Sequence, residues 1–145
     1  MYPLIVVPDT DAQRDWYGRH LGFSTAIDID WFVYVTSPAE RPLGLSFMRE
    51  GLDLGVPGFR TPLTGDALVI TIEVEDAEVA LREVEATGAT PVIALRDEPW
   101  GQRHFMLRDA AGIWVDIVQE TEPDPTYFPQ SAREARTAAL DELRG

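Results

Sequence analysis

Cysteine and lysine are both absent from this 145-residue sequence. Without cysteine the chain has no disulfide, no thiolate nucleophile and no cysteine-based zinc or iron–sulfur site. Lysine and a glycine-rich phosphate loop are missing too, so no residue pattern indicates covalent chemistry or a nucleotide cofactor. No apolar run reaches the length of about 18 residues needed to cross a membrane, and the N-terminus lacks the features of a signal peptide. We therefore expect a cytoplasmic protein without a cofactor or a membrane partner.

Positive charge is scarce. Twelve arginines oppose 25 acidic residues, which gives a formal net charge of −13. Such a chain repels the phosphate backbone of nucleic acids and anionic membranes, so we expect no nucleic-acid partner. A neutral or cationic small molecule is the more compatible ligand, although the acidity could also serve solubility alone.

Two halves of the sequence repeat one order of elements: a strand, a helix and three further strands. In each half the predicted helix lies between an aspartate and a glycine, Asp9 and Gly22 in the first half and Asp76 and Gly88 in the second. Apolar and β-branched runs indicate the strands, and the strand at 23–29 has the weakest pattern. The expected strands are 4–7, 23–29, 31–36, 43–48, 67–74, 90–95, 103–107 and 113–118, and the expected helices are 11–21 and 76–87.

The repeat predicts the organisation of the chain. We expect one compact domain with a first module at 1–48, a linker at 49–66 and a second module at 67–120. Residues 121–145 are predicted to form a proline-rich linker and a C-terminal helix, because Ser131–Glu134 match a capping box.

Several motifs resemble one known family. The segment Asp9–Phe23, with Trp16 and Tyr17 inside it, and two consecutive βαβββ patterns resemble the vicinal oxygen chelate superfamily of glyoxalases, bleomycin resistance proteins and extradiol dioxygenases. The stretch 96–105 (RDEPWGQRHF) and the Asp109–Gly112 turn resemble its bleomycin-resistance-like branch. The resemblance covers residues 1–120. It implies an α+β fold of two tandem βαβββ modules that form a cupped mixed sheet with the helices outside. It also implies a homodimer with the cup near or across the interface.

The resemblance also implies where a metal would bind. Enzymes of the superfamily hold a divalent metal at four strand positions, which correspond here to Tyr2, Ser46, Val69 and Asp116. Of these only Asp116 is a suitable ligand, so we expect no metal site. A non-standard site built from Glu73, His104 and Asp116 stays an alternative.

Strand alternation predicts which residues line the cup. Ile113, Val115 and Ile117 form an apolar row that should face the helix, which leaves Trp114 and Asp116 facing the cup. The lining predicted in this way combines aromatic walls with a few polar groups, which is typical of a small-molecule pocket. The predicted ligand-binding residues are Trp31, Phe32, Ser46, Met48, Glu73, Trp100, Arg103, His104, Met106, Trp114 and Asp116.

Alternatives to a binding role exist for three of these residues. Trp114 could fill the core, Trp100 could clamp its own hairpin, and Arg103 could form a salt bridge at the rim.

Three functions follow from these patterns. The first is a metal-independent binding protein that sequesters a planar or cationic compound, such as an antibiotic, on tryptophan faces. The second is a metal-dependent lyase, isomerase or dioxygenase of the glyoxalase type. The third is a cofactor-less acid–base enzyme that uses His104 with Glu73 or Asp116. The missing metal ligands favour the first function over the second, and the sequence does not separate the first from the third. We therefore favour a binding protein without catalytic residues, and keep His104, Glu73 and Asp116 as the catalytic residues of the enzyme alternative.

Overall fold

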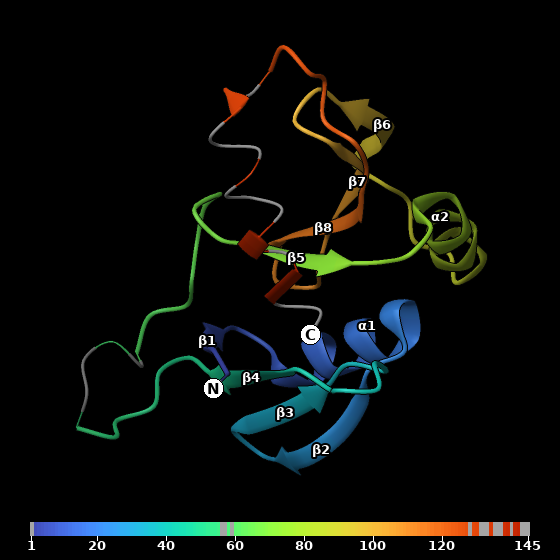
Figure 1. Cartoon of the computed structure of the whole chain (residues 1–145). Helices are drawn as coiled ribbons and strands as arrows, with labels where there is room; N and C mark the ends of the chain where they lie inside the picture. Colours follow the sequence, from blue (N-terminus) through green and yellow to red (C-terminus); the bar gives the residue numbers. More distant parts are fainter. Residues whose placement is uncertain are drawn as a thin grey trace.

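The computed structural model describes residues 2–55, 58, 60–127, 129–130, 134, 138–139 and 141–142. Within these residues the chain folds into two modules of identical element order (Figure 1). This result confirms the predicted α+β class and the tandem repeat, including the strand with the weakest pattern. The first module contains β1 (Leu4–Val7), α1 (Thr10–Leu21), β2 (Ser24–Ile29), β3 (Phe32–Thr36) and β4 (Gly44–Arg49). The second contains β5 (Val69–Glu73), α2 (Ala77–Ala86), β6 (Ile93–Glu98), β7 (Gln102–Arg108) and β8 (Trp114–Glu120).

Each module forms one mixed four-stranded sheet. The strand order is β1-β4-β3-β2 in the first sheet and β5-β8-β7-β6 in the second. The first strand of each module pairs in parallel with the last, and the other pairs are antiparallel. One edge strand of each sheet carries a register irregularity, between Thr25 and Ile27 in β2 and between Ile93 and Arg96 in β6.

Side-chain caps start both helices. Asp9 accepts a hydrogen bond from the Ala12 amide at 2.9 Å, and Asp76 accepts bonds from the amides of Glu78 and Val79. Such caps satisfy amide groups that have no partner inside the helix. The aspartates recognised in the sequence therefore do set the start of each helix.

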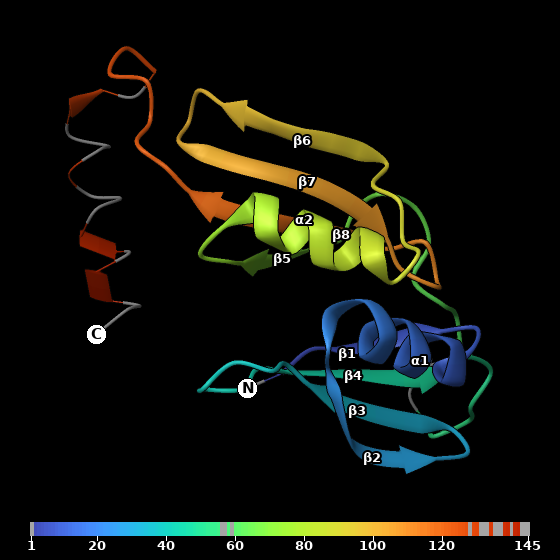
Figure 2. The ribbon, with the colours of Figure 1, turned by 90° about the vertical axis from the view of Figure 1, so that its right-hand side faces the viewer.

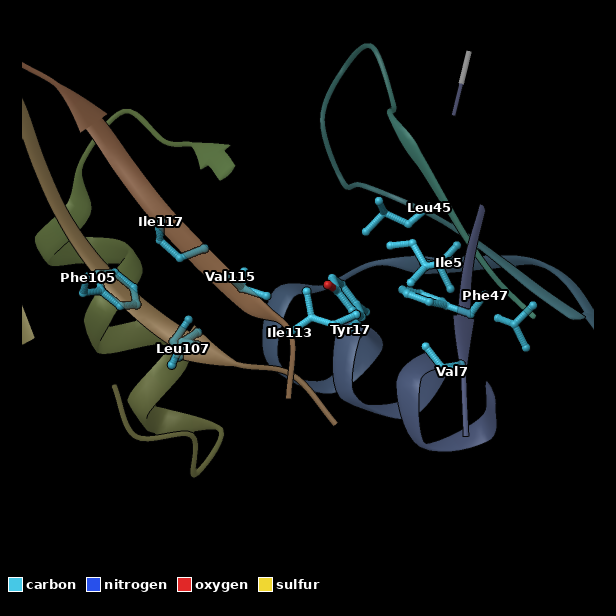
Figure 3. Close-up of a cluster of buried hydrophobic side chains, with 13 residues drawn as sticks. Ile5, Val7, Tyr17, Leu45, Phe47, Phe105, Leu107, Ile113, Val115 and Ile117 are labelled. Carbon is cyan, nitrogen blue, oxygen red and sulfur yellow. The ribbon is translucent and has the colours of Figure 1, made fainter. Parts of the chain in front are cut away.

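One apolar core serves both modules. Figure 2 shows α1 and α2 on the same side of the molecule, in front of their sheets. The residues that alternation assigned to the helix side of β8, Ile113, Val115 and Ile117, are buried. Figure 3 shows them in a cluster that continues through Tyr17 of α1 to Phe47 of the first sheet. The two modules are therefore packed together through their helix sides.

A buried polar network links the two modules where their helix sides pack together, a region that we call the junction. Asp109, in the turn between β7 and β8, accepts hydrogen bonds from Gln13 Nε2 at 2.8 Å and from the Tyr17 hydroxyl at 3.2 Å, both on α1. Its other carboxylate oxygen accepts the amides of Ala111 and Ile113. Burial, together with the Asp109 charge, raises the pKa of Tyr17, so this hydroxyl stays a donor at neutral pH.

The arrangement of the sheets differs from the single cupped sheet that the resemblance implied. The described strands form two separate sheets, and the linker residue Leu63 donates its amide to Val6 at the edge of β1. Because the helix sides meet in the shared core, the helix-free faces of the two sheets do not face each other (Figures 1 and 2). A single chain therefore does not close a cup between its own sheets.

Two further expectations concern the chain end and membranes. The predicted C-terminal helix and its capping box at 131–134 fall largely on residues outside the described ones. No helix in the described part of the chain has the length and apolar character needed to cross a membrane.

Candidate functional site

We call the side of each sheet away from its helix the open face. On the open face of the first sheet, residues aligned across the strands are apolar, aromatic or small. Phe32 pairs with Ile29 and Met48, and Tyr34 pairs with Ile27 and Ser46. Ile27 and Ile29 are each 46% exposed. Among the described strand residues that pair across this face none carries a charge.

The open face of the second sheet is polar. His104 of β7 lies at its centre, aligned with Arg96 on β6 and Val118 on β8. Glu73 continues this row on β5. The neighbouring rows contain Met106, Asp116 and Thr71 on one side and Glu98, Gln102 and Glu120 on the other.

His104 lies between two carboxylates. Its Nδ1 atom is 2.8 Å from Asp116 Oδ1, and its Nε2 atom is 3.2 Å from Glu98 Oε1. The residue is 5% exposed, so solvent reaches the ring only slightly. Since an ionised carboxylate only accepts, satisfying both contacts requires protons on both ring nitrogens or one proton on a carboxyl group. The arrangement can therefore hold a positive imidazolium between two negative charges.

Glu98 has a second cationic neighbour. Arg96 Nε donates to the same Glu98 oxygen that contacts His104. Burial would raise the pKa of Glu98, but the hydrogen bonds from His104 and Arg96 outweigh it and lower the pKa. Glu98 is therefore a stable anion at neutral pH.

Two aromatic rings lie beside this cluster. Trp100, in the turn between β6 and β7, has its ring centroid 6.4 Å from the His104 ring. Its indole Nε1 donates to Gln102 at 2.7 Å, and Gln102 donates to Glu120 at 2.9 Å. Tyr127, beyond the end of β8, lies with its ring 6.0 Å from Trp100.

A shallow cavity of about 400 Å³ opens next to these groups. Its lining comes from the ends of β5 and β8 and contains three carboxylates and one amide. Glu120 lines the cavity and also accepts the hydrogen bond from Gln102, which itself accepts the indole proton of Trp100. The lining residues are Glu73, Val74, Glu75, Gln119 and Glu120.

Comparison with known proteins identifies the family. Residues 2–117 match the family model described as Glyoxalase/Bleomycin resistance protein/Dioxygenase superfamily. The chain belongs to this superfamily. No curated protein matches the sequence.

Solved structures agree on the fold of this superfamily member. A glyoxalase/bleomycin resistance protein/dioxygenase from Nocardioides is 18% identical with a TM-score of 0.72, over 89% of this chain and 88% of the other. A lactoylglutathione lyase from Agrobacterium tumefaciens is 18% identical with a TM-score of 0.65, over 82% and 91%. A bleomycin resistance determinant encoded on transposon Tn5 is 19% identical with a TM-score of 0.62, over 83% and 96%. At these identities the likeness shows the fold, and the neighbours include both a bleomycin resistance determinant and a lyase.

The four positions that correspond to the superfamily's metal ligands do not fit a metal. Val69 has no donor atom, the Ser46 hydroxyl is buried and donates to the Pro3 carbonyl at 2.7 Å, and Tyr2 packs its ring against Tyr34. Asp116 is bonded to His104. No group of three or more histidine or acidic residues within the described part of the chain has a metal-binding arrangement. The residues of this superfamily member therefore do not make up the usual donor set.

The predicted ligand-binding residues divide into two groups on two sheets. Trp31, in the β2–β3 turn, lies against Phe32 with ring centroids 5.9 Å apart. Phe32, Ser46 and Met48 lie on the open face of the first sheet, while Glu73, His104, Met106, Trp114 and Asp116 lie on that of the second. Trp100 lies at the edge of the second group, beside His104.

Two predicted residues have other partners. Arg103 lies on the helix side of β7, away from His104, where it pairs with Glu78 of α2 and Asp97. Trp114 is held at the far end of the second sheet, with the Arg108 guanidinium 3.3 Å from its ring centre and its indole donating to Asp66. One face of the Trp114 ring is therefore occupied within the protein.

Sequence reasoning missed three residues of the cluster. It paired His104 with Glu73 or Asp116; the structure shows the Asp116 contact and adds a contact with Glu98, which the sequence interpretation did not name. Alternation along β6 could have identified Glu98, because Arg96 and Glu98 share one face of the strand. Gln102 could have been found by the same rule, since it lies two residues before His104. No sequence signal indicated Tyr127, because its segment was interpreted as a linker.

Proposed function

We propose that this superfamily member is a metal-independent small-molecule-binding protein that sequesters a planar or cationic compound, such as an antibiotic. The observation that carries the proposal is the His104 cluster with its bounding tryptophan, which combines orienting charges and an aromatic wall on one face. Aromatic faces attract planar groups and cations, and carboxylates favour a positive ligand. The poor metal-donor set supports binding without a metal.

The binding site needs a second wall, which we assign to a second copy of the chain. The open face of the first sheet exposes Leu4, Ile27 and Ile29, and its paired strand residues are uncharged. Placed against the His104 face of another copy, it would supply the apolar wall that pockets for small molecules have. We therefore propose a homodimer with two equivalent sites, each built from two different sheets.

Oligomeric state tests this arrangement. In analytical ultracentrifugation the wild type should sediment as a dimer, and Ile29→Asp should sediment as a monomer because it places a charge on the apolar wall. Val92→Asp is the matched control, since Val92 is also exposed and lies outside both open faces. A monomeric wild type, or a dimeric Ile29→Asp variant, would contradict the shared site.

Ligand screening tests the function itself. We expect planar cations to quench the tryptophan fluorescence at micromolar concentration and to be recovered chemically unchanged, as judged by mass spectrometry. Elemental analysis of the purified protein should find no stoichiometric metal, and added nickel, zinc, iron or manganese should not alter binding. Stoichiometric metal would instead support a glyoxalase-type lyase, isomerase or dioxygenase.

One observation favours a second candidate function. The Asp116–His104 contact of 2.8 Å is a carboxylate–imidazole pair of the kind that performs acid–base catalysis. Against this role, the contact of Nε2 with Glu98 occupies the nitrogen that would exchange a proton with a substrate. Chemical conversion of a bound compound by the wild type, lost in His104→Ala, would establish the enzyme.

A further inference from the structure

We propose that Trp100 and Tyr127 form a two-ring subsite that stacks on the planar part of a cationic ligand, and that Gln102 is the residue that positions it. This inference rests on the proposed binding function and names where, and by which groups, the ligand is held. It assigns a binding role to the segment after β8, which the sequence indicated only as a linker.

Gln102 holds Trp100 in one orientation. The side-chain oxygen of Gln102 accepts the indole proton at 2.7 Å, while its nitrogen donates to Glu120 at 2.9 Å. Both ends of the amide are thus in use, which fixes the amide and the indole that depends on it. The Trp100 and His104 rings meet at an interplanar angle of 75°, so the two rings do not stack face to face. Trp100 is therefore held beside His104 without parallel stacking between them.

Tyr127 is brought to Trp100 by a segment that is attached to the same turn. Thr121 donates its amide to the Gly101 carbonyl at 2.9 Å, and Asp124 donates its amide to the Pro99 carbonyl at 2.9 Å. The Asp124 side chain accepts from Thr126, and Tyr127 donates its amide to the Asp124 carbonyl. The chain after β8 is therefore folded into a defined turn over the β6–β7 hairpin.

Gly101 makes this attachment possible. Its φ of +91° is unfavourable for other residues, and a β-carbon there would lie 2.7 Å from the Thr121 carbonyl oxygen. The close approach brings the segment directly onto the hairpin backbone. The position of Tyr127 thus depends on specific backbone contacts and not on a loose tail.

The two rings make a corner with charged groups at its base. Their centroids are 6.0 Å apart and their planes meet at 52°, so they are splayed and not stacked on each other. The Tyr127 residue is 48% exposed. Glu98, which contacts His104, begins the turn that carries Trp100, and Glu120 is tied to Trp100 through Gln102. Aromatic faces close to carboxylates select a planar cation over a planar anion.

The test uses proflavine, a planar cation, and anthraquinone-2-sulfonate, a planar anion, with the full-length protein. Tyr127→Ala and Gln102→Leu should each weaken proflavine binding about 3- to 10-fold, the effect of losing one aromatic contact. Tyr127→Phe keeps the ring and should bind as the wild type does. Val92→Ala, an exposed apolar truncation outside the subsite, is the matched control and should also leave binding unchanged. The anion should bind at least about 10-fold more weakly than the cation.

A spectroscopic measurement separates positioning from a general structural effect. In protein labelled with 5-fluorotryptophan, Gln102→Leu should shift the Trp100 fluorine resonance, assigned with Trp100→Phe, and leave the Trp16, Trp31 and Trp114 resonances in place. The unfolding midpoint should stay within the range of the control variant.

The outcomes distinguish the two proposals. If the wild type binds neither proflavine nor any other member of a planar-cation panel, the proposed function fails and the subsite fails with it. If the wild type binds proflavine and both Tyr127→Ala and Gln102→Leu bind it equally well, the subsite is overturned and the binding function stands. Equal binding of the anion would overturn the assigned charge preference.

Discussion

The two sheets share a topology and a common core, yet their open faces have opposite chemistry. In the first sheet the row through Phe32 consists of apolar side chains, and Ile29 at its outer end is 46% exposed. In the second sheet the corresponding region holds His104 between Asp116 and Glu98. The strand order is the same in both, so the fold does not determine this difference. A repeated module can therefore provide two open faces of different chemistry within one chain.

On their helix sides, in contrast, the two sheets have similar chemistry. There both modules contribute apolar residues to one continuous cluster, and polar contacts across the junction include the Asp109 network and the His20–Thr87 contact. Substitutions at the junction should therefore lower stability more than substitutions elsewhere on the two sheets.

The largest effect is expected at the junction. Asp109→Ala removes the acceptor for Gln13 and Tyr17, both of which are fully buried. Leaving buried donors unpaired at such a site should lower the free energy of unfolding by about 3–5 kcal/mol, measured by urea denaturation. Asp97→Ala, at an exposed carboxylate, should change it by less than about 0.5 kcal/mol. Equal effects of the two variants would mean that the modules are not held together by this network.

A smaller effect is expected at one glycine in each module. Gly101→Ala would place a β-carbon 2.7 Å from a backbone oxygen at a φ of +91°, and should cost about 2–4 kcal/mol. Gly44→Ala meets the Tyr34 ring, which can move in part, and should cost about 1–3 kcal/mol. Thermal denaturation measures both, with Gly58→Ala as the control, because no atom of the described residues lies within 4 Å of a β-carbon at that position. A larger loss of stability in Gly44→Ala than in Gly101→Ala would contradict this expectation.

The two sides of β7 should respond differently to truncation. His104→Ala leaves the partly buried Asp116 and Glu98 without their shared donor, and should lower the free energy of unfolding by about 1–3 kcal/mol. Arg103→Ala, on the helix side, removes partly exposed ion pairs and should cost less than about 1 kcal/mol. Urea denaturation of both variants tests the comparison, which a larger effect of Arg103→Ala would contradict.

The smallest effects are in the dependence of stability on pH. Burial and the Arg19 charge lower the pKa of His20, which contacts Thr87 across the junction. Its contribution is therefore complete above the usual pKa of 6.5 and is lost as the pH falls below it. The lowered pKa of Glu98 gives a contribution that is complete above the usual 4.5 and is lost at lower pH.

Difference curves against the wild type separate these two groups. The stability difference for His20→Asn should change between pH 7 and 5, and that for Glu98→Gln should change below about pH 4.5, where the Glu98 carboxylate takes up a proton. A Glu98→Gln curve that stays flat below pH 4.5 would show that Glu98 does not have the lowered pKa described above.

The sequence predicted local structure well and the relative placement of the modules poorly. Asp9 and Asp76 marked the helix starts, and alternation assigned Ile113, Val115 and Ile117 to the core, because these signals act within a few residues. The orientation of the sheets depends on contacts such as Gln13–Asp109, between residues 96 positions apart, which no local pattern indicates.

The candidate site was predicted in part for the same reason. His104 and Asp116 were placed on one face by alternation, and the structure brings them within hydrogen-bond distance. The Glu98 contact depends on the β6–β7 register, which the irregularity between Ile93 and Arg96 shifts. Tyr127 depends on backbone contacts of a segment without secondary structure.

The irregular outer strands have a consequence for colloidal stability. An exposed edge strand can recruit another extended chain and start fibrillar aggregation. Here β2 and β6, one edge strand of each sheet, each break their register once, and Leu63 of the linker bonds to the edge of β1. Because a bulge bends a strand away from regular pairing, neither β2 nor β6 offers a long uniform template. These features shorten the length of sheet edge that could recruit another extended chain.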